Sequence, residues 1–462
     1  MEEFDLIVIG AGPAGTPAAM AAAMFGKRVL LIDKRDAPGG ECLFEGCIPS
    51  KVLENAANRY KMLKDASRFH VALKSTPQIH WEEVLQDKEA IIKRRSQAAL
   101  MQIKQLPNLT YLQGVAKFTD EYTIEANEKK YKFKKALIAT GGKVNLPPFK
   151  GSGVDKAWTN RDVFFESEIP KEVVFIGAGA ISSELAGMFN ELGVKCTILE
   201  RGERILKRVD KEAALGVQER MIENGVRIEL GVDIDEINYN NGIFEINFRQ
   251  NGEQKVIKSP HVLLATGRVA NVENLGLENI GVEFDKHGVK VNEFLQTTKE
   301  HIFACGDCIN APKFAHTASY EAGITVHNMF APNNHKTDFS KNSWVLFTSP
   351  EIASVGLSEE EAKEKGLDIE VWKYDYKIDA KAQIDKEELG FVKFVTDKKS
   401  GTVLGVQILS EDAASLIGEA SLIVANKMNA MQIMSAVHPH PTLNEGFGKL
   451  AQKIFMSNMM RR

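Results

Sequence analysis

Two cysteines that lie close together in the sequence are the residues best suited to redox chemistry. Cys42 and Cys47 fall in the segment GGECLFEGCIPSK. A disulfide needs Cα atoms roughly 4.4–6.8 Å apart, whereas residues five positions apart are separated by about 8.5 Å in a helix and by more in a strand. A bond between the two cysteines therefore requires an irregular turn, for which Gly46 supplies backbone freedom.

A helix from about Pro49 to Lys64 should follow this turn, because proline suits the first turn of a helix. One or both sulfurs would then lie at the positive N-terminal end of that helix, which stabilises a thiolate. We therefore predict a redox-active pair. The alternatives are two unrelated cysteines beside a glycine loop, or a metal site, for which no further His or Cys lies nearby.

A second chemical segment, HPHPTLNE, lies near the other end of the chain at 438–445. A dithiol must lose its protons as it forms a disulfide, and an imidazole that titrates near neutral pH suits that transfer. A carboxylate can orient the imidazole and stabilise its cation. The segment therefore contains the residue types of a general base for thiol chemistry.

The composition indicates an ordinary globular enzyme of about three domains, with 462 residues and a net charge of -4. This charge gives no reason to expect nucleic acid or a membrane as a partner. The acidic N-terminus is unlike a signal peptide, and no apolar run approaches the ~18 residues of a transmembrane helix. We expect a cytoplasmic protein. Its five cysteines, in a chain of this length, do not form a framework of structural disulfides.

The N-terminal segment has the pattern of a dinucleotide-binding βαβ unit. An apolar run at 4–9 leads into GAGPAG, an alanine-rich segment and a second apolar run that ends in Asp33. Gly10 permits the tight turn, Gly12 lets the backbone approach a pyrophosphate, and Gly15 lets helix and strand pack closely. Asp33 can accept hydrogen bonds from ribose hydroxyls. The alternative is a glycine turn in an unrelated βαβ unit.

The same pattern recurs from residue 173, where a strand leads into Gly177 and Gly179 and a later strand ends in Glu200. Ser182 replaces the third glycine but is small enough for close packing. The second copy implies either that the chain binds two dinucleotides or that one copy binds a dinucleotide and the other has lost this ability. Because both copies keep the acid, two bound dinucleotides are favoured. Glu200 would repel a 2′-phosphate, which favours NAD(H) over NADP(H). Two nearby cations, Arg201 and Lys207, could instead bind the 2′-phosphate of NADP(H).

The remaining signals give the domain plan. Residues 118–135 alternate like a solvated hairpin, and from about 340 short strands alternate with polar helices without a nucleotide motif. We expect an α/β protein with two Rossmann-like dinucleotide-binding domains and a C-terminal α+β dimerisation domain. The predicted boundaries are 1–146 for the first part of the FAD domain, 147–266 for the NAD domain, 267–338 for the second, central part of the FAD domain, and 339–462 for the dimerisation domain.

In order and spacing, these motifs resemble the class I pyridine nucleotide–disulfide oxidoreductases over essentially the whole length. The two glycine motifs, the cysteine segment, ATGR at 265–268, ACGD at 304–307 and the histidine segment carry the resemblance. It implies FAD on the first βαβ unit and NAD(H) on the second. It also implies a homodimer in which His440 and Glu445 serve the cysteines of the other subunit, while His438 is structural or exposed.

The resemblance also implies individual roles. Cys47 would face the flavin and Cys42 would exchange with the substrate. Lys51 would lie near the flavin N5, paired with Glu184, and Asp307 would bind the ribitol. Further cofactor contacts are implied for Ala139, Thr140, Gly141, Gly267 and Ala315.

Within the family, the motifs CIPSK and HPHPT favour dihydrolipoamide dehydrogenase. The lipoyl group would then be free or carried by another protein, such as a subunit of a 2-oxoacid dehydrogenase complex. The alternatives are a glutathione reductase-like enzyme, a mercuric reductase-like enzyme, a quinone-reducing flavoenzyme, and a mainly structural subunit of a complex. Glu200 argues against the NADPH that glutathione reductases use. Mercuric reductases carry a C-terminal cysteine pair, and this sequence has no cysteine beyond Cys308 before it ends in MMRR.

Several positions depart from the family pattern. Phe44 replaces a common asparagine, and Glu45 adds a negative charge between the cysteines. Cys305 and Cys308 form a CxxC at the ACGD motif. We interpret this second pair as two small buried residues near the flavin, and a second redox centre is the alternative.

Overall fold

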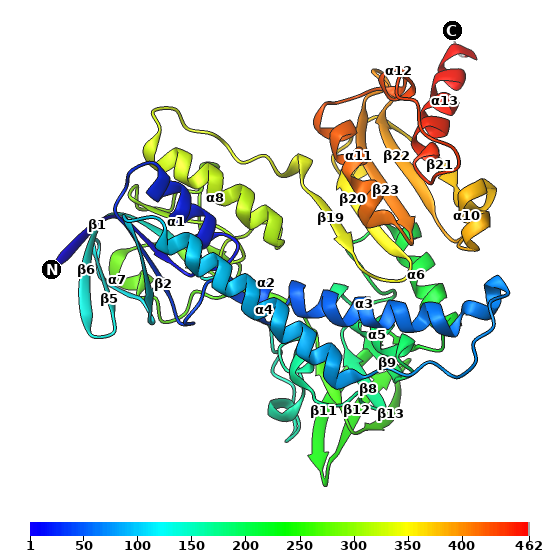
Figure 1. Cartoon of the computed structure of the whole chain (residues 1–462), viewed down its shortest axis with the longest axis horizontal. Coiled ribbons are helices and arrows are strands. Elements are labelled where there is room, and N and C mark those ends of the chain that lie inside the picture. The colour runs from blue at the N-terminus through cyan, green and yellow to red at the C-terminus, as the bar shows by residue number, and fades with distance from the viewer. Residues whose placement is uncertain (461–462) are drawn as a thin grey trace. The chain divides into compact units, whose positions relative to one another are not determined.

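The computed structural model describes residues 1–460 and divides into two compact units (Figure 1). Arg461 and Arg462, the last two residues of the MMRR ending, lie outside the described residues. Unit 1 comprises Met1–Pro147, Trp158–Ile169 and Thr266–Thr337. Unit 2 comprises Pro148–Ala157, Pro170–Ala265 and the chain from Asp338 onward.

Unit 1 is built on a seven-stranded sheet. Its strands are β1 (Glu2–Ile9), β2 (Val29–Asp33), β3 (Leu109–Gln113), β4 (Lys117–Asp120), β5 (Thr123–Ala126), β6 (Lys129–Ile138) and β18 (Ile302–Ala304). They lie in the order β3-β2-β1-β6-β5-β4, with β18 paired to β6. The pairs among β3, β2, β1, β6 and β18 are parallel, and the β4-β5-β6 pairs are antiparallel. The apolar run at 4–9 forms the buried central strand β1.

Helices α1 (Gly15–Met24) and α8 (Ala315–Phe330) contact each other beside this sheet (Figure 1). A second helical layer holds α2 (Gly40–Phe44), α3 (Cys47–Lys64) and the long α4 (Trp81–Lys104). It is fixed to the 158–169 segment, because the Trp81 indole N–H and the buried Lys88 ammonium donate to backbone carbonyls there. Shorter elements of unit 1 are β7 (Gly142–Val144), β15 (Arg268–Ala270), α7 (Leu277–Ile280), β16 (Phe284–Asp285) and β17 (Gly288–Val289).

The first part of unit 2 repeats the plan of unit 1. Its four parallel strands are β8 (Glu172–Ile176), β9 (Lys195–Glu200), β10 (Arg227–Leu230) and β14 (Val262–Leu264), in the order β10-β9-β8-β14. The helices are α5 (Ala180–Glu191) and α6 (Lys211–Glu223). An antiparallel sheet follows, with β11 (Val232–Asn240), β12 (Ile243–Gln250) and β13 (Glu253–Ser259). The recurrence of strand order explains the recurrence of the glycine motif in the sequence.

The C-terminal part of unit 2 is a five-stranded antiparallel sheet in the order β19-β20-β23-β22-β21. Its strands are β19 (Ser343–Leu346), β20 (Glu351–Gly356), β21 (Ile369–Asp375), β22 (Phe391–Asp397) and β23 (Val403–Ser410). Its helices are α9 (Glu359–Glu364), α10 (Ala380–Asp385), α11 (Ala413–Ala425), α12 (Ala430–Met434) and α13 (Glu445–Met460). Helix α11 packs on β20 and β23. The buried Lys393 ammonium lies 3.0 Å from Asp210 and 2.8 Å from Glu212, so an ion cluster joins β22 to α6.

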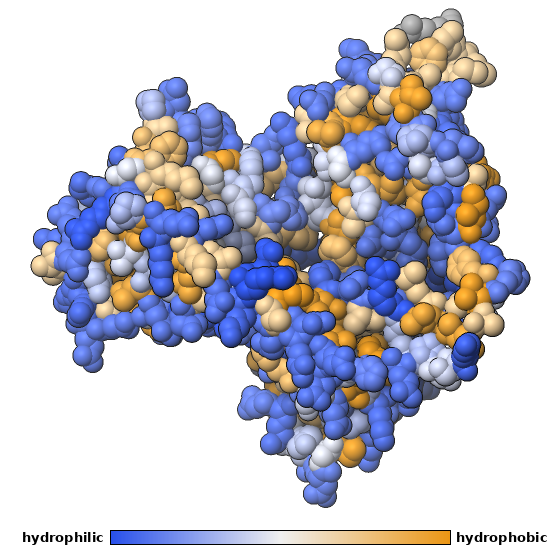
Figure 2. Space-filling view, viewed as in Figure 1, coloured by the Kyte–Doolittle hydropathy of each residue, from blue (hydrophilic) through white to orange (hydrophobic). Residues whose placement is uncertain are grey.

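The predicted fold class is confirmed, with two Rossmann-like regions and a C-terminal α+β region. The hairpin predicted at 118–135 is present as β4 to β6. The finer four-part division of the chain stays a proposal. Polar side chains cover most of the face drawn in Figure 2. None of the described helices is both long and apolar enough to cross a membrane, and the expected cytoplasmic location stays a prediction.

Candidate active site

The first glycine loop has the geometry that its sequence predicts. Gly10 has φ +101°, and a Cβ added there would lie 2.3 Å from the Ala139 carbonyl oxygen. A Cβ at Gly15 would lie 1.8 Å from the carbonyl oxygen of Gly10, so helix α1 can approach β1 only with glycine there. A Cβ added at Gly12 would lie 3.8 Å from the Gly40 Cα, which is an ordinary van der Waals contact. The first loop therefore requires glycine at positions 10 and 15, and its contact with a pyrophosphate stays a prediction.

The second glycine loop, before α5, borders open space at Gly179. Gly177 has φ +93°, and a Cβ added at Gly179 would meet no described atom within 4 Å. Ser182, in the place of the third glycine, is fully buried, and among the described residues its hydroxyl has no hydrogen-bond partner. Serine is therefore tolerated in this helix packing, as the sequence predicts.

Both loops can hold a phosphate. Helices α1 and α5 begin at Gly15 and Ala180, and their N-cap residues, Ala14 and Gly179, make no side-chain hydrogen bond to the N-terminal N–H groups. Uncapped N–H groups and the positive end of the helix dipole suit an anion. The residues present therefore fit a dinucleotide on each loop.

The two strand-end acids have a role that the sequence did not reveal. An Asp33 carboxylate oxygen accepts a hydrogen bond from the Ala11 N–H at 2.6 Å, and a Glu200 oxygen accepts one from the Ala178 N–H at 2.7 Å. In both copies the acid lies 22 residues after the residue whose N–H donates to it. Each acid thus fixes its glycine loop to the next strand. The equal separation was the available signal; binding of ribose stays a prediction.

The predicted irregular turn between the cysteines is confirmed. Helix α2 ends at Phe44, Glu45 and Gly46 break the helical path, and α3 begins at Cys47. Cys42 is half-buried and Cys47 is exposed. The side-chain hydrogen bond with Cys47 and burial raise the pKa of the Cys42 thiol. The two sulfurs are therefore in mutual reach, with Cys47 at the N-terminus of α3.

The predicted neighbours of the flavin are distributed over both units. In unit 1 the Lys51 ammonium lies 2.5 Å from Glu54. In unit 2 Glu184 accepts a hydrogen bond from the Phe347 N–H at 3.0 Å. Because Lys51 and Glu184 belong to different units, their predicted pairing stays a prediction.

The other predicted cofactor contacts of unit 1 surround the ends of β6 and β18. Asp307 lies 3.6 Å from Arg268; burial raises the pKa of Asp307 despite the nearby cations. The Thr140 hydroxyl donates to the Asn271 carbonyl at 2.7 Å, which fixes the loop after β6. The remaining predicted contacts are Ala139 and Gly141 after β6, Gly267 before β15, and Ala315 at the start of α8.

Cys305 and Cys308 are fully buried, as the sequence interpretation expected. Burial raises the pKa of both thiols, that of Cys308 to about 12. Glu321 lies beside them, accepts the Gly306 N–H at 2.5 Å, and has a pKa raised by burial to about 7. The sequence reasoning missed Glu321, because only the fold places it behind the ACGD loop.

His440 and Glu445 form the predicted dyad. The His440 Nδ1 lies 2.9 Å from a Glu445 oxygen, and the imidazole is 69% exposed while the carboxylate is 14% exposed. The Thr442 N–H also donates to this carboxylate at 3.2 Å. His438 instead lies 2.7 Å from Glu419 and is mostly buried, which agrees with a structural role. An exposed imidazole held by a fixed carboxylate can accept a proton from an incoming thiol.

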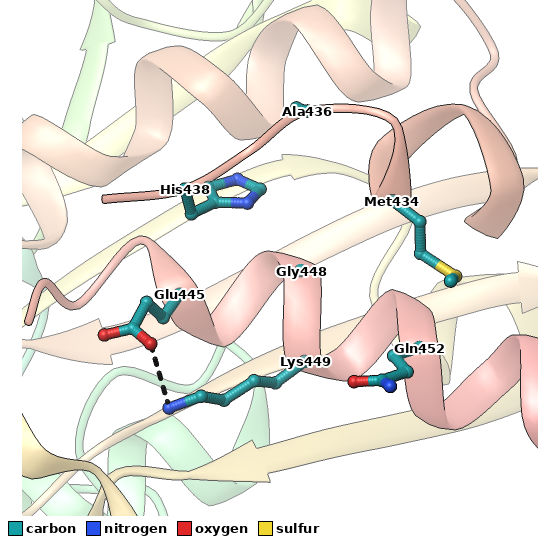
Figure 3. A pocket seen from close by; sticks show the side chains of 7 residues that line it. All are labelled: Met434, Ala436, His438, Glu445, Gly448, Lys449 and Gln452. Carbon is teal, nitrogen blue, oxygen red and sulfur yellow. Dashed lines mark ion pairs between the residues drawn. The ribbon is translucent and has the colours of Figure 1, made fainter. Parts of the chain in front are cut away.

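A pocket of about 240 Å³ lies beside the dyad (Figure 3). Its lining residues are Met434, Ala436, His438, Glu445, Gly448, Lys449 and Gln452. Figure 3 shows the Lys449 side chain running along α13 toward Glu445, with 3.4 Å between the charged groups. The Lys449 ammonium also donates to the Tyr374 hydroxyl at 3.2 Å. The carboxylate of the dyad is thus held from two sides, by His440 and by Lys449.

We expect Lys449→Met to weaken the dyad. Burial raises the pKa of Glu445, but the Thr442 N–H, His440 and Lys449 outweigh it and lower the pKa overall. Loss of the cation should therefore move the acid limb of the kcat/KM profile to higher pH. Since a partly exposed ion pair contributes ~1 kcal/mol or less, the loss at neutral pH should be about fivefold or less. Lys453→Met, at an exposed position of α13, is the matched control; identical profiles for the two variants would contradict this role of Lys449.

Comparison with known proteins agrees with this geometry. Residues 4–322 match the model of the pyridine nucleotide-disulphide oxidoreductases, and residues 342–451 match the dimerisation domain of the same family. A mercuric reductase of Lysinibacillus sphaericus is 34% identical over 455 residues, which is 98% of this chain and 83% of the relative. A dihydrolipoyl dehydrogenase of Bacillus subtilis is 34% identical over 450 residues, covering 96% and 94%.

Among solved structures, the Cu(II) complex of the HOCl-induced flavoprotein disulfide reductase RclA from Escherichia coli aligns with a TM-score of 0.87. The alignment covers 98% of this chain and all of the other, at 23% identity. At that identity the likeness establishes the fold and leaves the substrate open.

Proposed function

The chain belongs to the pyridine nucleotide-disulphide oxidoreductase family, and on that premise we propose that it oxidises dihydrolipoyl groups with NAD⁺. As a member of this family it is a flavoprotein that uses FAD and a nicotinamide dinucleotide. The choice of a dithiol substrate rests on the His440–Glu445 dyad. A dithiol has protons to lose, whereas a mercuric ion has none, so a base held by a carboxylate suits the former.

The protein groups then have distinct tasks in dithiol oxidation. The first substrate thiol loses its proton to solvent, and the resulting thiolate attacks the Cys42 sulfur of the oxidised pair while Cys47 leaves as a thiolate. The second substrate thiol gives its proton to His440 and attacks the substrate sulfur of the mixed disulfide, and Cys42 leaves as a thiolate. The substrate has lost two protons and two electrons, and the enzyme pair holds the electrons. Bound FAD supplies the electron transfer from this pair to NAD⁺.

We place FAD on the loop of Gly10, Gly12 and Gly15, and NAD(H) on the loop of Gly177 and Gly179. Lys51, Asp307 and the backbone around Gly141 would contact FAD. The uncapped N–H groups at the start of α1 and α5 support these assignments. Glu200 would exclude a 2′-phosphate by charge.

We also propose a homodimer with shared active sites. The chain carries the family's dimerisation domain. Exposed apolar side chains gather on α12, on α13 and in the segment between them, near the end of the chain in Figure 2; they include Met431, Val437, Met456 and Met459. In this dimer His440 of one subunit would act on the cysteines of the other. A 2-oxoacid dehydrogenase complex could present the lipoyl group.

A substrate panel tests the function directly. Dihydrolipoamide, glutathione disulfide, mercuric ion and a quinone are assayed with NAD(H) and NADP(H) in parallel. We expect the highest kcat/KM for dihydrolipoamide with NAD⁺, and a preference for NAD(H) of about tenfold to a hundredfold because like charges repel at Glu200. Highest turnover of mercuric ion would replace the proposal with a mercuric reductase. A preference for NADPH would overturn the role of Glu200.

A further inference from the structure

Glu41, directly before Cys42, is bound tightly by an arginine. Arg268 donates two hydrogen bonds to its carboxylate, at 2.9 and 2.6 Å. The side chains of Arg268 and Glu41 are only 21% and 19% exposed. Burial raises the pKa of Glu41, but Arg268 and Arg161 outweigh it and lower the pKa overall. A two-bond guanidinium–carboxylate contact of this kind fixes orientation as well as charge.

Glu45, two residues before Cys47, is held by two further arginines. The Arg161 Nε lies 3.2 Å from one carboxylate oxygen, and Arg35 donates to the other. The Arg35 guanidinium also lies 4.8 Å from the centre of the Phe44 ring. Phe44 and Glu45, the two residues between the cysteines that depart from the family pattern, are therefore both bound by arginine.

The three arginines come from distant parts of unit 1. Arg35 follows β2, Arg161 lies in the 158–169 segment, and Arg268 begins β15. They face three carboxylates around the cysteine turn: Glu41, Glu45 and Asp307. Exposed ion pairs contribute little to stability, but these groups are mostly buried and linked. The turn is thus tied to three segments at once, and its negative charges are balanced.

We propose that Arg35, Arg161 and Arg268, the arginine clamp, position the Cys42–Cys47 turn and set the reduction potential of the pair. The inference rests on the proposed function in that it takes this pair as the redox centre. Unbalanced carboxylates next to the sulfurs would disfavour thiolates. Because reduction produces thiolate, the clamp makes the disulfide easier to reduce. The arginines are positioning residues, since none of them exchanges electrons or protons with the substrate.

The test measures the reduction potential of the pair against a glutathione redox buffer, together with the rate at which iodoacetamide alkylates the reduced protein. For Arg161→Met we expect alkylation to slow about tenfold and the dithiol–disulfide equilibrium to shift about tenfold toward disulfide, which corresponds to about 30 mV. Arg161→Lys keeps the charge and should stay within about threefold of wild type. Arg28→Met, at an exposed pair with Glu2, is the matched control and should change neither quantity.

Glu45→Gln tests the clamp from the opposite side. It should shift the equilibrium toward dithiol, and combined with Arg161→Met it should return the potential most of the way to wild type. Equal reduction potentials for Arg161→Met and Arg28→Met would overturn the proposal. A double variant whose reduction potential is no closer to wild type than that of Arg161→Met would overturn it as well. If Arg161→Met does not fold, the dithiol–disulfide equilibrium of Glu45→Gln decides the question: a shift toward dithiol supports the proposal, and no shift overturns it. None of these measurements uses the physiological substrate, so a different substrate in the panel would leave the test intact.

Discussion

Replacement of Cys47 by serine is expected to abolish oxidation of dihydrolipoamide, with a fall in kcat of at least about a thousandfold. Serine cannot form the disulfide that receives the substrate electrons, and a lone Cys42 thiol offers no disulfide sulfur for a substrate thiolate to attack. The variant should keep FAD, because the sulfur is outside the glycine loop that would hold the dinucleotide. Steady-state kinetics and the flavin content of the purified protein measure both effects.

Cys196→Ser is the matched control. Cys196 lies buried in β9, burial raises the pKa of its thiol to about 12, and the thiol donates to the Val194 carbonyl. A serine hydroxyl can make the same contact, so kcat should stay within about twofold of wild type. If Cys47→Ser retained full activity, the cysteines would be secondary. The chain would then be a flavoenzyme that passes electrons directly to a quinone or another acceptor.

Replacement of His440 by glutamine is expected to lower kcat for dihydrolipoamide by about a hundredfold to ten-thousandfold. Glutamine can still bond to Glu445 but cannot take up the thiol proton. His438→Gln is the control two positions away: its partner is Glu419, and we expect activity within about threefold of wild type with a modest loss of stability. Equal losses of activity in the two variants would show that the segment acts through its fold.

Co-expression of Cys47→Ser and His440→Gln subunits tests where this base acts. If each site combines the cysteines of one subunit with the histidine of the other, a mixed dimer has one intact site. Random pairing makes about half of the dimers mixed, so the mixture should recover about a quarter of wild-type activity. Sites confined to one subunit would recover nothing, because each subunit carries a defect.

Local chemistry explains what could be predicted from the sequence. Gly10 must adopt a positive φ, and Gly15 must pack against an adjacent backbone. No other residue fits such positions, so these glycines can be recognised in the sequence. The spacing of Cys42 and Cys47 already required a broken helix, and the structure breaks it at Glu45 and Gly46. Repetition of the βαβ pattern predicted two dinucleotide-binding regions. The remaining role assignments came from resemblance and stay predictions.

By itself, then, the sequence determined the elements and the broken helix between the cysteines, while the resemblance supplied the pairing of His440 with Glu445. Only the tertiary structure decided what surrounds them. Glu41 and Arg268 are 227 positions apart, and nothing in either neighbourhood indicates that they meet. The acids Asp33 and Glu200 bind backbone N–H groups that have no side-chain signature. Long-range contacts of this kind depend on how strands and loops are brought together, which a single sequence read along its length does not contain.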